Sequence, residues 1–298
     1  MEPIDEAAAM TIRLLDGMRA VADAYDGFIV DLWGVLHDGA QPLPGSVECL
    51  QALKRAGKRI ALLSNAPRPA APVIQRLTEI GFPREAYDDV MTSGEETWRH
   101  LVRRDDPWYA ALGERCYMIG PTRDLGMLVD VRAARVFDLE AADFILNTGA
   151  DYGDTVEKFE PLLQRALARA LPMICANPDL EVMMRGRREI CAGALAVRYE
   201  AIGGAVRYHG KPHRSVYESC FAMLDGAARD RVCAIGDSLR TDIAGAQGAG
   251  IDSILVIGGI HAEGLGVGPG ELPPVDRLEA LCAEIGVRPQ AAIAGLRW

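Results

Sequence analysis

Three aspartates lie at places in the sequence where a sheet could bring their carboxylates together. Asp31 ends the apolar run at residues 28–30, and Asp237 and Asp242 follow a second such run at residues 232–235. Carboxylates that share one crevice repel one another unless a positive charge lies among them. Mg²⁺ prefers one or two carboxylates together with substrate phosphate oxygens. The three aspartates therefore predict a magnesium site that handles a phosphoryl group, although Asp31 alone would equally fit a turn after a core strand.

Ser64 and Lys211 could hold the phosphoryl group beside such a cation. Ser64 follows the apolar run at residues 60–63, and Lys211 precedes Pro212, which suits the first position of a helix. A cation at a helix N-terminus is unfavourable for the helix dipole, which favours an anionic partner for Lys211. Ser64 and Asn65 also fit the cap of the helix that follows them. Both roles stay open here, since a hydroxyl at a helix start can also bind an anion.

An alternation of strands and helices positions these residues. A strand, a helix and a strand of this length form a βαβ unit with parallel strands and a right-handed crossover. Ligands bind such sheets at the carboxyl ends of the strands, where Asp31, Ser64 and Asp237 are expected. The periodicity predicts strands near residues 28–31, 59–63, 89–91, 231–236 and 251–256, and helices near 11–24, 46–57, 73–77, 93–101, 212–224, 243–248 and 276–285.

A polar segment at residues 105–107 separates this pattern from a second α/β pattern. A chain of 298 residues holds about two domains. We therefore predict a discontinuous core domain at residues 1–110 and 208–298, with an inserted α/β domain at residues 111–207. In the insert, strands are expected near residues 116–119, 144–148 and 172–175, and helices up to 129 and near 155–170 and 191–203.

The composition favours a small-molecule partner. Hydrophobic residues make up 49% and charged residues 25% of the chain, and the formal net charge of −10 gives no basic footprint for nucleic acid. Seven cysteines, an odd number without a C-x-x-C pair, fit reduced thiols better than disulfides or a zinc site. No apolar run reaches the ~18 residues that span a membrane, and the first residues are acidic where a signal peptide would be basic. We expect a cytoplasmic protein.

Four ordered motifs carry a resemblance that covers nearly the whole chain. They are DLWGVLHDG at residues 31–39, LLSNAPR at 62–68, GKP at 210–212 and IGDSLRTDIAGAQGAGI at 235–251, with NPD at 177–179 beside them. In these motifs the chain resembles the haloacid dehalogenase (HAD) superfamily, in its class IIA branch of NagD-like and nitrophenylphosphatase-like phosphatases. The resemblance implies a Rossmann-like parallel-sheet core with an inserted cap of the C2a type, Mg²⁺ as cofactor, a small phosphorylated metabolite as substrate and a possible homodimer through the cap.

The same resemblance implies a role for each matching residue. Asp31 would be the nucleophile that becomes an aspartyl phosphate. Mg²⁺ would be held by Asp31, the backbone carbonyl of Trp33 and Asp237, and oriented by Asp242. Ser64, Asn65 and Lys211 would hold the phosphate, and Lys211 would also keep Asp31 anionic. Further substrate contacts are expected from Leu32, Trp33, Gly34, Asn177 and Asp179.

Substrate choice is expected in the inserted domain, in loops near residues 147–152 and 177–179. The basic cluster at residues 185–188 also lies there, and it fits either a solvated hairpin turn or a contact with a phosphate or nucleotide. The sequence does not name the substrate.

The chain departs from the family at Trp33, where these phosphatases carry a second Asp as general acid and base. An indole N–H donates hydrogen bonds but cannot shuttle protons. General acid–base catalysis contributes roughly 10²–10⁴-fold to the rate, so this change would slow the hydrolysis of alkyl phosphates more than that of aryl or acyl phosphates.

Three interpretations of Trp33 follow. In the first, His37 or Asp38 carries the proton, because a histidine titrates near neutral pH; the alternative for this pair is a solvated loop. In the second, the protein is a weak or inactive relative that binds a phosphorylated ligand. In the third, the nucleophile attacks carbon as in dehalogenases. The intact acidic loop at residues 236–242 disfavours the third, since dehalogenases need no Mg²⁺.

Overall fold

The chain folds into two compact units, each with its own sheet. The computed structural model describes residues 11–184 and 187–298. The first unit holds the described residues up to Leu63, with Gln75–Val90 and Tyr217–Trp298, and the second holds Ser64–Ile74 and Met91–Val216. Within the described residues, no helix combines the length and the apolar character that crossing a membrane requires.

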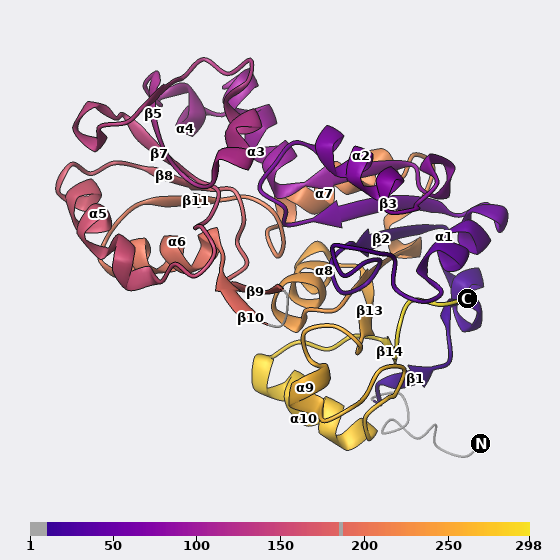
Figure 1. Cartoon of the computed structure of the whole chain (residues 1–298). Helices are drawn as coiled ribbons and strands as arrows, with labels where there is room; N and C mark the ends of the chain where they lie inside the picture. Colours follow the sequence, from indigo (N-terminus) through magenta and orange to yellow (C-terminus); the bar gives the residue numbers. More distant parts are fainter. Residues whose placement is uncertain (1–10, 185–186) are drawn as a thin grey trace, which may run out of the picture. The chain divides into compact units, whose positions relative to one another are not determined.

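A seven-stranded sheet forms the core of the first unit (Figure 1). Neighbouring strands pair in parallel all the way from β1 to β3. β2 lies between β12 and β3, with Val30 opposite Ile235 and Asp31 opposite Leu63. The predicted parallel α/β class is therefore confirmed. The order is β1 (Arg13–Leu15), β14 (Ala291–Ile293), β13 (Asp252–Val256), β12 (Val232–Gly236), β2 (Gly27–Asp31), β3 (Arg59–Ser64) and β4 (Asp89–Thr92).

Helices cover this sheet through apolar faces. A cluster beneath β13 and β14 combines side chains from a π-helix at Leu239–Ile243 and from α9 and α10. α1 follows β2 as predicted and ends before Gly57, whose φ of +74° suits a helix stop. The helices of this unit are α1 (Ser46–Arg55), α8 (Ala244–Ala249), α9 (Ala262–Leu265) and α10 (Val275–Ile285), while α2 (Ala70–Glu79) and α7 (Arg214–Met223) are divided between the two units.

The second unit is built on a five-stranded parallel sheet with helices on both faces (Figure 1). Successive residues of β7 point to opposite faces, as they must in a strand. Ile145 packs in the cluster with α5 and α6, whereas Phe144 and Leu146 pack in the cluster with α3 and α4. The strand order is β11 (Val206–Tyr208), β8 (Met173–Cys175), β7 (Phe144–Asn147), β5 (Arg115–Ile119) and β6 (Ala134–Val136), and the helices are α3 (Ser93–Arg103), α4 (Pro107–Ala110), α5 (Val156–Ala168) and α6 (Ala192–Ala201).

The grouping of α3 with the second unit differs from the predicted limits of the insert. Trp98 and Leu101 of α3 pack in the same apolar cluster as Phe144 of the five-stranded sheet. β11, which crosses residue 207, pairs in parallel with β8 of that sheet. The boundaries at residues 111–207 stay a prediction, and packing joins residues on both sides of them to the insert's sheet.

The predicted helix at residues 11–24 is wrong. The segment forms β1 and two short 3-10 helices, Met18–Ala20 and Ala22–Ala24. Gly17 lies between β1 and the first 3-10 helix in a fully extended conformation, and a Cβ there would lie 2.9 Å from the carbonyl oxygen of Arg297. The apolar residues of this segment have nearly helical spacing. No helix forms, because β1 pairs with the distant β14 and Gly17 packs closely against Arg297.

The position predicted for Pro212 is also wrong. α7 begins at Arg214, and Pro212 follows a cis peptide bond in the turn before it. The His213 N–H donates to the Gly210 carbonyl at 2.9 Å, which closes this turn and leaves Lys211 within it.

The basic cluster contributes to a hairpin, β9 (Glu181–Met184) and β10 (Arg187–Ile190), which pair antiparallel. Arg187 and Arg188 are exposed, and Arg188 pairs with Glu181 at 3.1 Å. Residues 185–186 of the cluster lie outside the described residues. All seven cysteines are buried, and none forms a disulfide in the structure.

Candidate active site

Three buried carboxylates meet at the carboxyl edge of the seven-stranded sheet. Asp31 is the last residue of β2, and Asp237 follows the neighbouring β12 directly. Asp242 lies in the π-helix that begins two residues later. One oxygen from each of the three carboxylates lies within 4.8 Å of the other two, and the residues are 7%, 8% and 4% exposed. The sheet therefore brings these three aspartates together as the sequence predicts.

Backbone N–H groups orient two of these carboxylates. Asp237 Oδ2 accepts the N–H of Ile260 at 2.9 Å, and Asp242 Oδ2 accepts the N–H of Ser238 at 3.0 Å. Carboxylates so close together repel unless a cation lies among them, and hard oxygen donors suit Mg²⁺. The donor set thus fits the predicted ion.

Gly34 lets the loop after β2 approach Asp237. Its φ is +79°, and a Cβ there would lie 2.3 Å from Asp237 Oδ2. A Cβ at Gly259 would lie 1.9 Å from the same oxygen. Two glycine backbones therefore pack against one carboxylate from different segments, and a side chain at either position would displace Asp237.

The Trp33 indole packs inside its own loop. A Cβ at Gly39, where φ is +92°, would lie 2.4 Å from Cη2 of the Trp33 ring. The His37 ring meets the indole edge to face, with 5.8 Å between centroids and 82° between planes. The half-buried indole is therefore held by contacts on the loop that it belongs to.

His37 is a buried member of this loop, so the interpretation of a solvated pair is wrong for it. The Gly39 N–H donates to His37 Nδ1 at 3.0 Å, so Nε2 carries the ring proton in the neutral form. Burial lowers the pKa of His37 to about 4. The exposed Asp38 accepts the N–H groups of Ala40 and Gln41 at 2.8 and 2.9 Å, and these bonds lower its pKa. Near neutral pH the pair is a neutral imidazole and an anionic carboxylate.

A second group of predicted site residues meets within the second unit. Asn65 Nδ2 donates to Asp179 Oδ1 at 2.8 Å and to the Lys211 carbonyl at 3.1 Å, and the Lys211 N–H donates to Asn65 Oδ1 at 2.8 Å. Asn177 Oδ1 accepts the N–H of Asp179 at 3.0 Å. Lys211 is 3% exposed. The amide of Asn65 thus joins NPD at residues 177–179 to GKP at 210–212.

Ser64 and Asn65 do not cap the following helix. α2 begins only at Ala70, whose N–H donates to Glu95 Oε2 at 3.0 Å. Ser64 Oγ instead accepts the N–H of Ala66 at 3.2 Å. This turn separates Ser64 from the helix and leaves its role in anion binding as a prediction.

Sequence reasoning missed Ser93 and Glu96. Ser93 Oγ donates to the carbonyls of Ala66 and Ala176 at 3.1 and 2.6 Å, which ties two loops together. Glu96 Oε2 accepts the N–H of Gly210 at 3.0 Å. Ser93 could have been predicted, because it directly follows β4 and residues at the carboxyl ends of such strands reach the ligand-binding edge of the sheet. Glu96 could not, because it looks like an ordinary polar residue of an amphipathic helix.

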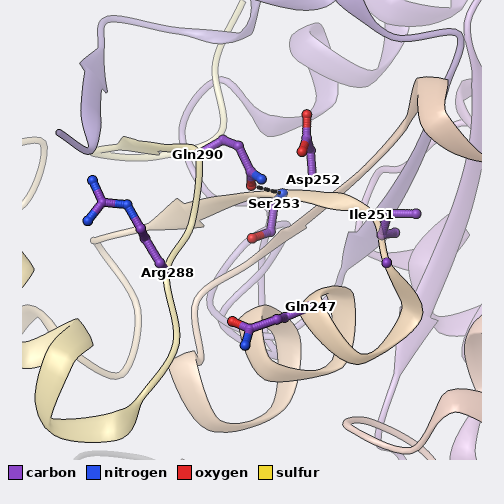
Figure 2. A pocket seen from close by; sticks show the side chains of 7 residues that line it. Gln247, Ile251, Asp252, Ser253, Arg288 and Gln290 are labelled. Carbon is purple, nitrogen blue, oxygen red and sulfur yellow. Dashed lines mark hydrogen bonds between the residues drawn. The ribbon is translucent and has the colours of Figure 1, made fainter. Parts of the chain in front are cut away.

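A pocket of about 250 Å³ lies elsewhere in the first unit (Figure 2). It is lined at the beginning of β13 by Asp252 and Ser253, and the Ser253 N–H donates to Gln290 Oε1 at 2.6 Å. The aspartate cluster lies at the carboxyl ends of the parallel strands, which is the opposite edge. The pocket is therefore separate from the candidate site.

A hydrolase of the haloacid dehalogenase-like family from Brucella suis 1330 has a solved structure that matches this chain. The two are 32% identical with a TM-score of 0.81, over 95% of this chain and 100% of the other. This chain belongs to the haloacid dehalogenase family. Family models described as haloacid dehalogenase-like hydrolase and HAD-hydrolase-like match residues 28–132 and 208–274, and these segments contain all three clustered aspartates. The prediction of a hydrolase of this superfamily is confirmed.

Other members of the haloacid dehalogenase family are more distant. D-glycerol 3-phosphate phosphatase of Mycobacterium tuberculosis is 26% identical over 251 residues, which are 82% of this chain but only 66% of that protein. Ribonucleotide monophosphatase NagD of Escherichia coli K12 is 26% identical over 243 residues, 78% of this chain and 88% of that one. The Mycobacterium tuberculosis glycerol phosphate phosphatase in complex with magnesium has a TM-score of 0.61 at 26% identity, over 80% and 70% of the two chains. The NagD relationship agrees with class IIA.

Proposed function

We propose that this protein is a Mg²⁺-dependent phosphatase that hydrolyses a small phosphate monoester through an aspartyl phosphate on Asp31. The observation that carries the proposal is the cluster of Asp31, Asp237 and Asp242, three buried carboxylates with oxygens within 4.8 Å of one another. The phosphatases among the relatives support the reaction class, and the relative in complex with magnesium supports the ion.

Asp31 and Asp237 would hold Mg²⁺ with the Trp33 carbonyl, and Asp242 would orient it. When bound, the ion would neutralise charge that develops on the transferring phosphoryl group. The protein's own part is to hold the carboxylates still. Hydrogen bonds from Ile260 and Ser238 do so, together with the backbone packing of Gly34 against Asp237.

The phosphate-binding roles of Ser64, Asn65 and Lys211 rest on the family resemblance. Asn65 would act through its amide, which fixes the backbone of Lys211 by two hydrogen bonds. Asn177 and Asp179 belong to the same hydrogen-bonded group and would contact the substrate, as would Leu32, Trp33 and Gly34. Lys211 would supply positive charge for the phosphoryl oxygens.

Trp33 determines how well a leaving group can depart. Without an acid at this position, an alkoxide must leave unprotonated, whereas a phenolate or carboxylate leaves readily as an anion. His37 is neutral near pH 7 and its Nδ1 accepts a hydrogen bond, so any proton it gives must come from Nε2. We therefore expect aryl and acyl phosphates to be hydrolysed faster than alkyl phosphates.

The test is hydrolysis of 4-nitrophenyl phosphate with Mg²⁺ or with EDTA, by wild type and Asp31→Asn. We expect turnover that needs Mg²⁺ and is lost in the variant, although the variant keeps its fold by circular dichroism. Turnover that persists in Asp31→Asn would overturn the proposed nucleophile.

A second candidate function follows from Trp33 itself, namely a protein that binds a phosphorylated ligand without turning it over. It predicts that phosphorylated metabolites raise the melting temperature while no phosphate is released. Multiple turnovers with any phosphate ester would exclude it. Release of halide from a 2-haloacid in EDTA would instead reveal dehalogenase chemistry. A cytoplasmic location and a homodimer through the cap stay predictions.

A further inference from the structure

The second unit contains a buried cluster of two histidines and a glutamate outside the candidate active site. Glu96 and His100 lie on one face of α3, four residues apart, and His209 follows β11. One possible ligand atom from each of the three lies within 4.8 Å of the other two. Glu96 is 4% and His209 is 3% exposed, while His100 is half-buried.

His209 points a nitrogen without a hydrogen bond at the carboxylate. Among the described residues, Nδ1 of His209 is buried and has no hydrogen-bond partner, although Glu96 Oε2 lies 3.3 Å from it. The other ring nitrogen, Nε2, makes a hydrogen bond with the hydroxyl of Tyr109. His209 has two neutral tautomers here: in one, Tyr109 donates to Nε2 and the Nδ1 proton faces Glu96; in the other, Nε2 donates to Tyr109 and the lone pair of Nδ1 faces an oxygen lone pair of Glu96. The second arrangement needs a positive charge between the two atoms.

The distance between these two atoms suits a metal ion. Zn²⁺ binds nitrogen and oxygen ligands at about 2.0–2.1 Å, and two ligands at tetrahedral angles then lie about 3.3 Å apart. The 3.3 Å between His209 Nδ1 and Glu96 Oε2 matches this edge. Two imidazoles and one carboxylate form a donor set that zinc sites use, with a fourth position for water.

We propose that Glu96, His100 and His209 form a binding site for Zn²⁺ or a similar transition-metal ion, separate from the magnesium site of the aspartates. The unbonded Nδ1 of His209 and its spacing from Glu96 are the observations that carry this assignment.

Neighbouring groups complete the site as outer partners of metal ligands do. Tyr109 holds His209 by Nε2, and the His100 ring stacks on Tyr109 with 4.9 Å between centroids. The Gly210 N–H donates to Glu96 Oε2 at 3.0 Å.

The site would tie α3 to the segment that carries Lys211. His209 and Gly210 directly precede Lys211, and both contact Glu96 of α3. A bound ion would therefore hold the backbone before Lys211 against α3. It would not touch the Lys211 side chain or the three clustered aspartates. Its role would be structural, and its presence can be measured without any assay of hydrolysis.

The test is binding of Zn²⁺ and Co²⁺ to the full chain, first stripped of metal and then saturated with Mg²⁺ to occupy the aspartate cluster. We expect one equivalent of Zn²⁺ to bind and to raise the melting temperature, and Co²⁺ to give the visible absorption of a tetrahedral site. His100→Ala removes a ligand from a half-buried position, so the fold should persist while binding of both ions is lost.

His213→Ala is the matched control, because His213 lies four residues after His209 and stacks on Tyr208 outside the cluster. It should bind both ions as wild type does. Equal binding by wild type and His100→Ala, or no binding by wild type, would overturn the assignment. The second result would mean that a proton bridges His209 and Glu96 instead. Asp237→Asn should keep the zinc site, so a failure of the proposed phosphatase function would not affect this result.

Discussion

The Gly34 backbone lies against the carboxylate of Asp237, so closely that a Cβ at Gly34 would stand 2.3 Å from Oδ2. One residue without a side chain therefore links the loop after β2 to the acidic loop after β12. The contact lets Trp33 and Asp237 contribute to one site from strands that are distant in sequence. It also makes Gly34 a sensitive position for testing the proposed metal site.

Gly34→Ala should weaken Mg²⁺ binding and lower stability. A non-glycine residue in the left-handed region costs roughly 1–2 kcal/mol, and the new methyl group would in addition push Asp237 aside. Gly57→Ala is a matched control, because φ there is +74° but nothing lies within 4 Å of the added Cβ. Calorimetric titration with Mg²⁺ should show weaker binding in Gly34→Ala alone. Equal Mg²⁺ affinity in both variants would show that the contact does not position Asp237.

Trp33→Asp should raise the hydrolysis of alkyl phosphates. Restoring a carboxylate that can carry a proton should increase kcat/KM by about 10²–10⁴-fold, with a smaller gain for 4-nitrophenyl phosphate. Trp33→Asn loses the same packing against Gly39 and His37 without gaining an acid, so it separates the two effects. If Trp33→Asn and Trp33→Asp raised kcat/KM for alkyl phosphates equally, the gain would come from the space left by the indole and not from proton transfer.

Stability should fall on acidification because of His37. Its pKa is about 4 in the folded chain and 6.5 ordinarily, so the unfolded chain binds more protons between these values. The contribution is fully present above pH 6.5 and is lost as the pH falls toward 4. The contribution of His37 to the free energy of unfolding therefore falls by about 2 kcal/mol between about pH 7 and pH 5.

His37→Gln should reduce that pH dependence, because an amide oxygen can accept the Gly39 N–H without titrating. Urea unfolding of both proteins at the two pH values measures the difference. A pH dependence that is identical in wild type and His37→Gln would show that His37 is not buried as a neutral ring.

Asn65→Asp should destabilise the second unit, since it replaces a donor by an oxygen 2.8 Å from Asp179 Oδ1. The lost hydrogen bonds cost about 1–3 kcal/mol, and the two carboxylates then repel. Combining it with Asp179→Asn exchanges donor and acceptor, so the double variant should regain part of the stability in chemical denaturation. No recovery would mean that the bonds of Asn65 to Lys211 matter more than its bond to Asp179.

Much of the core could be predicted because its strands are buried on both faces. β2, β3, β12 and β13 are continuous apolar runs, and the rule that ligands bind at carboxyl strand ends then brought Asp31 and Asp237 together. β1 and β14 have three residues each, too few for a pattern, and β1 is fixed by a partner near the other end of the chain.

The environment of single side chains could not be predicted in this way. The sequence places His37 in a loop but does not show that the loop folds over it and buries it. Likewise, Glu96 reads as a solvated helical residue until β11 brings His209 beside it. Both features depend on contacts between segments, which local spacing does not encode.

The pairing of β2 with β12 has a consequence for the growing polypeptide. Asp31 emerges from the ribosome early, yet its neighbours Asp237 and Asp242 follow only after the whole second unit has been made. Until β12 has been made, β2 can pair with β3 on one side only, and the three carboxylates cannot come together. Mg²⁺ binding would thus report that synthesis of the core has passed residue 242.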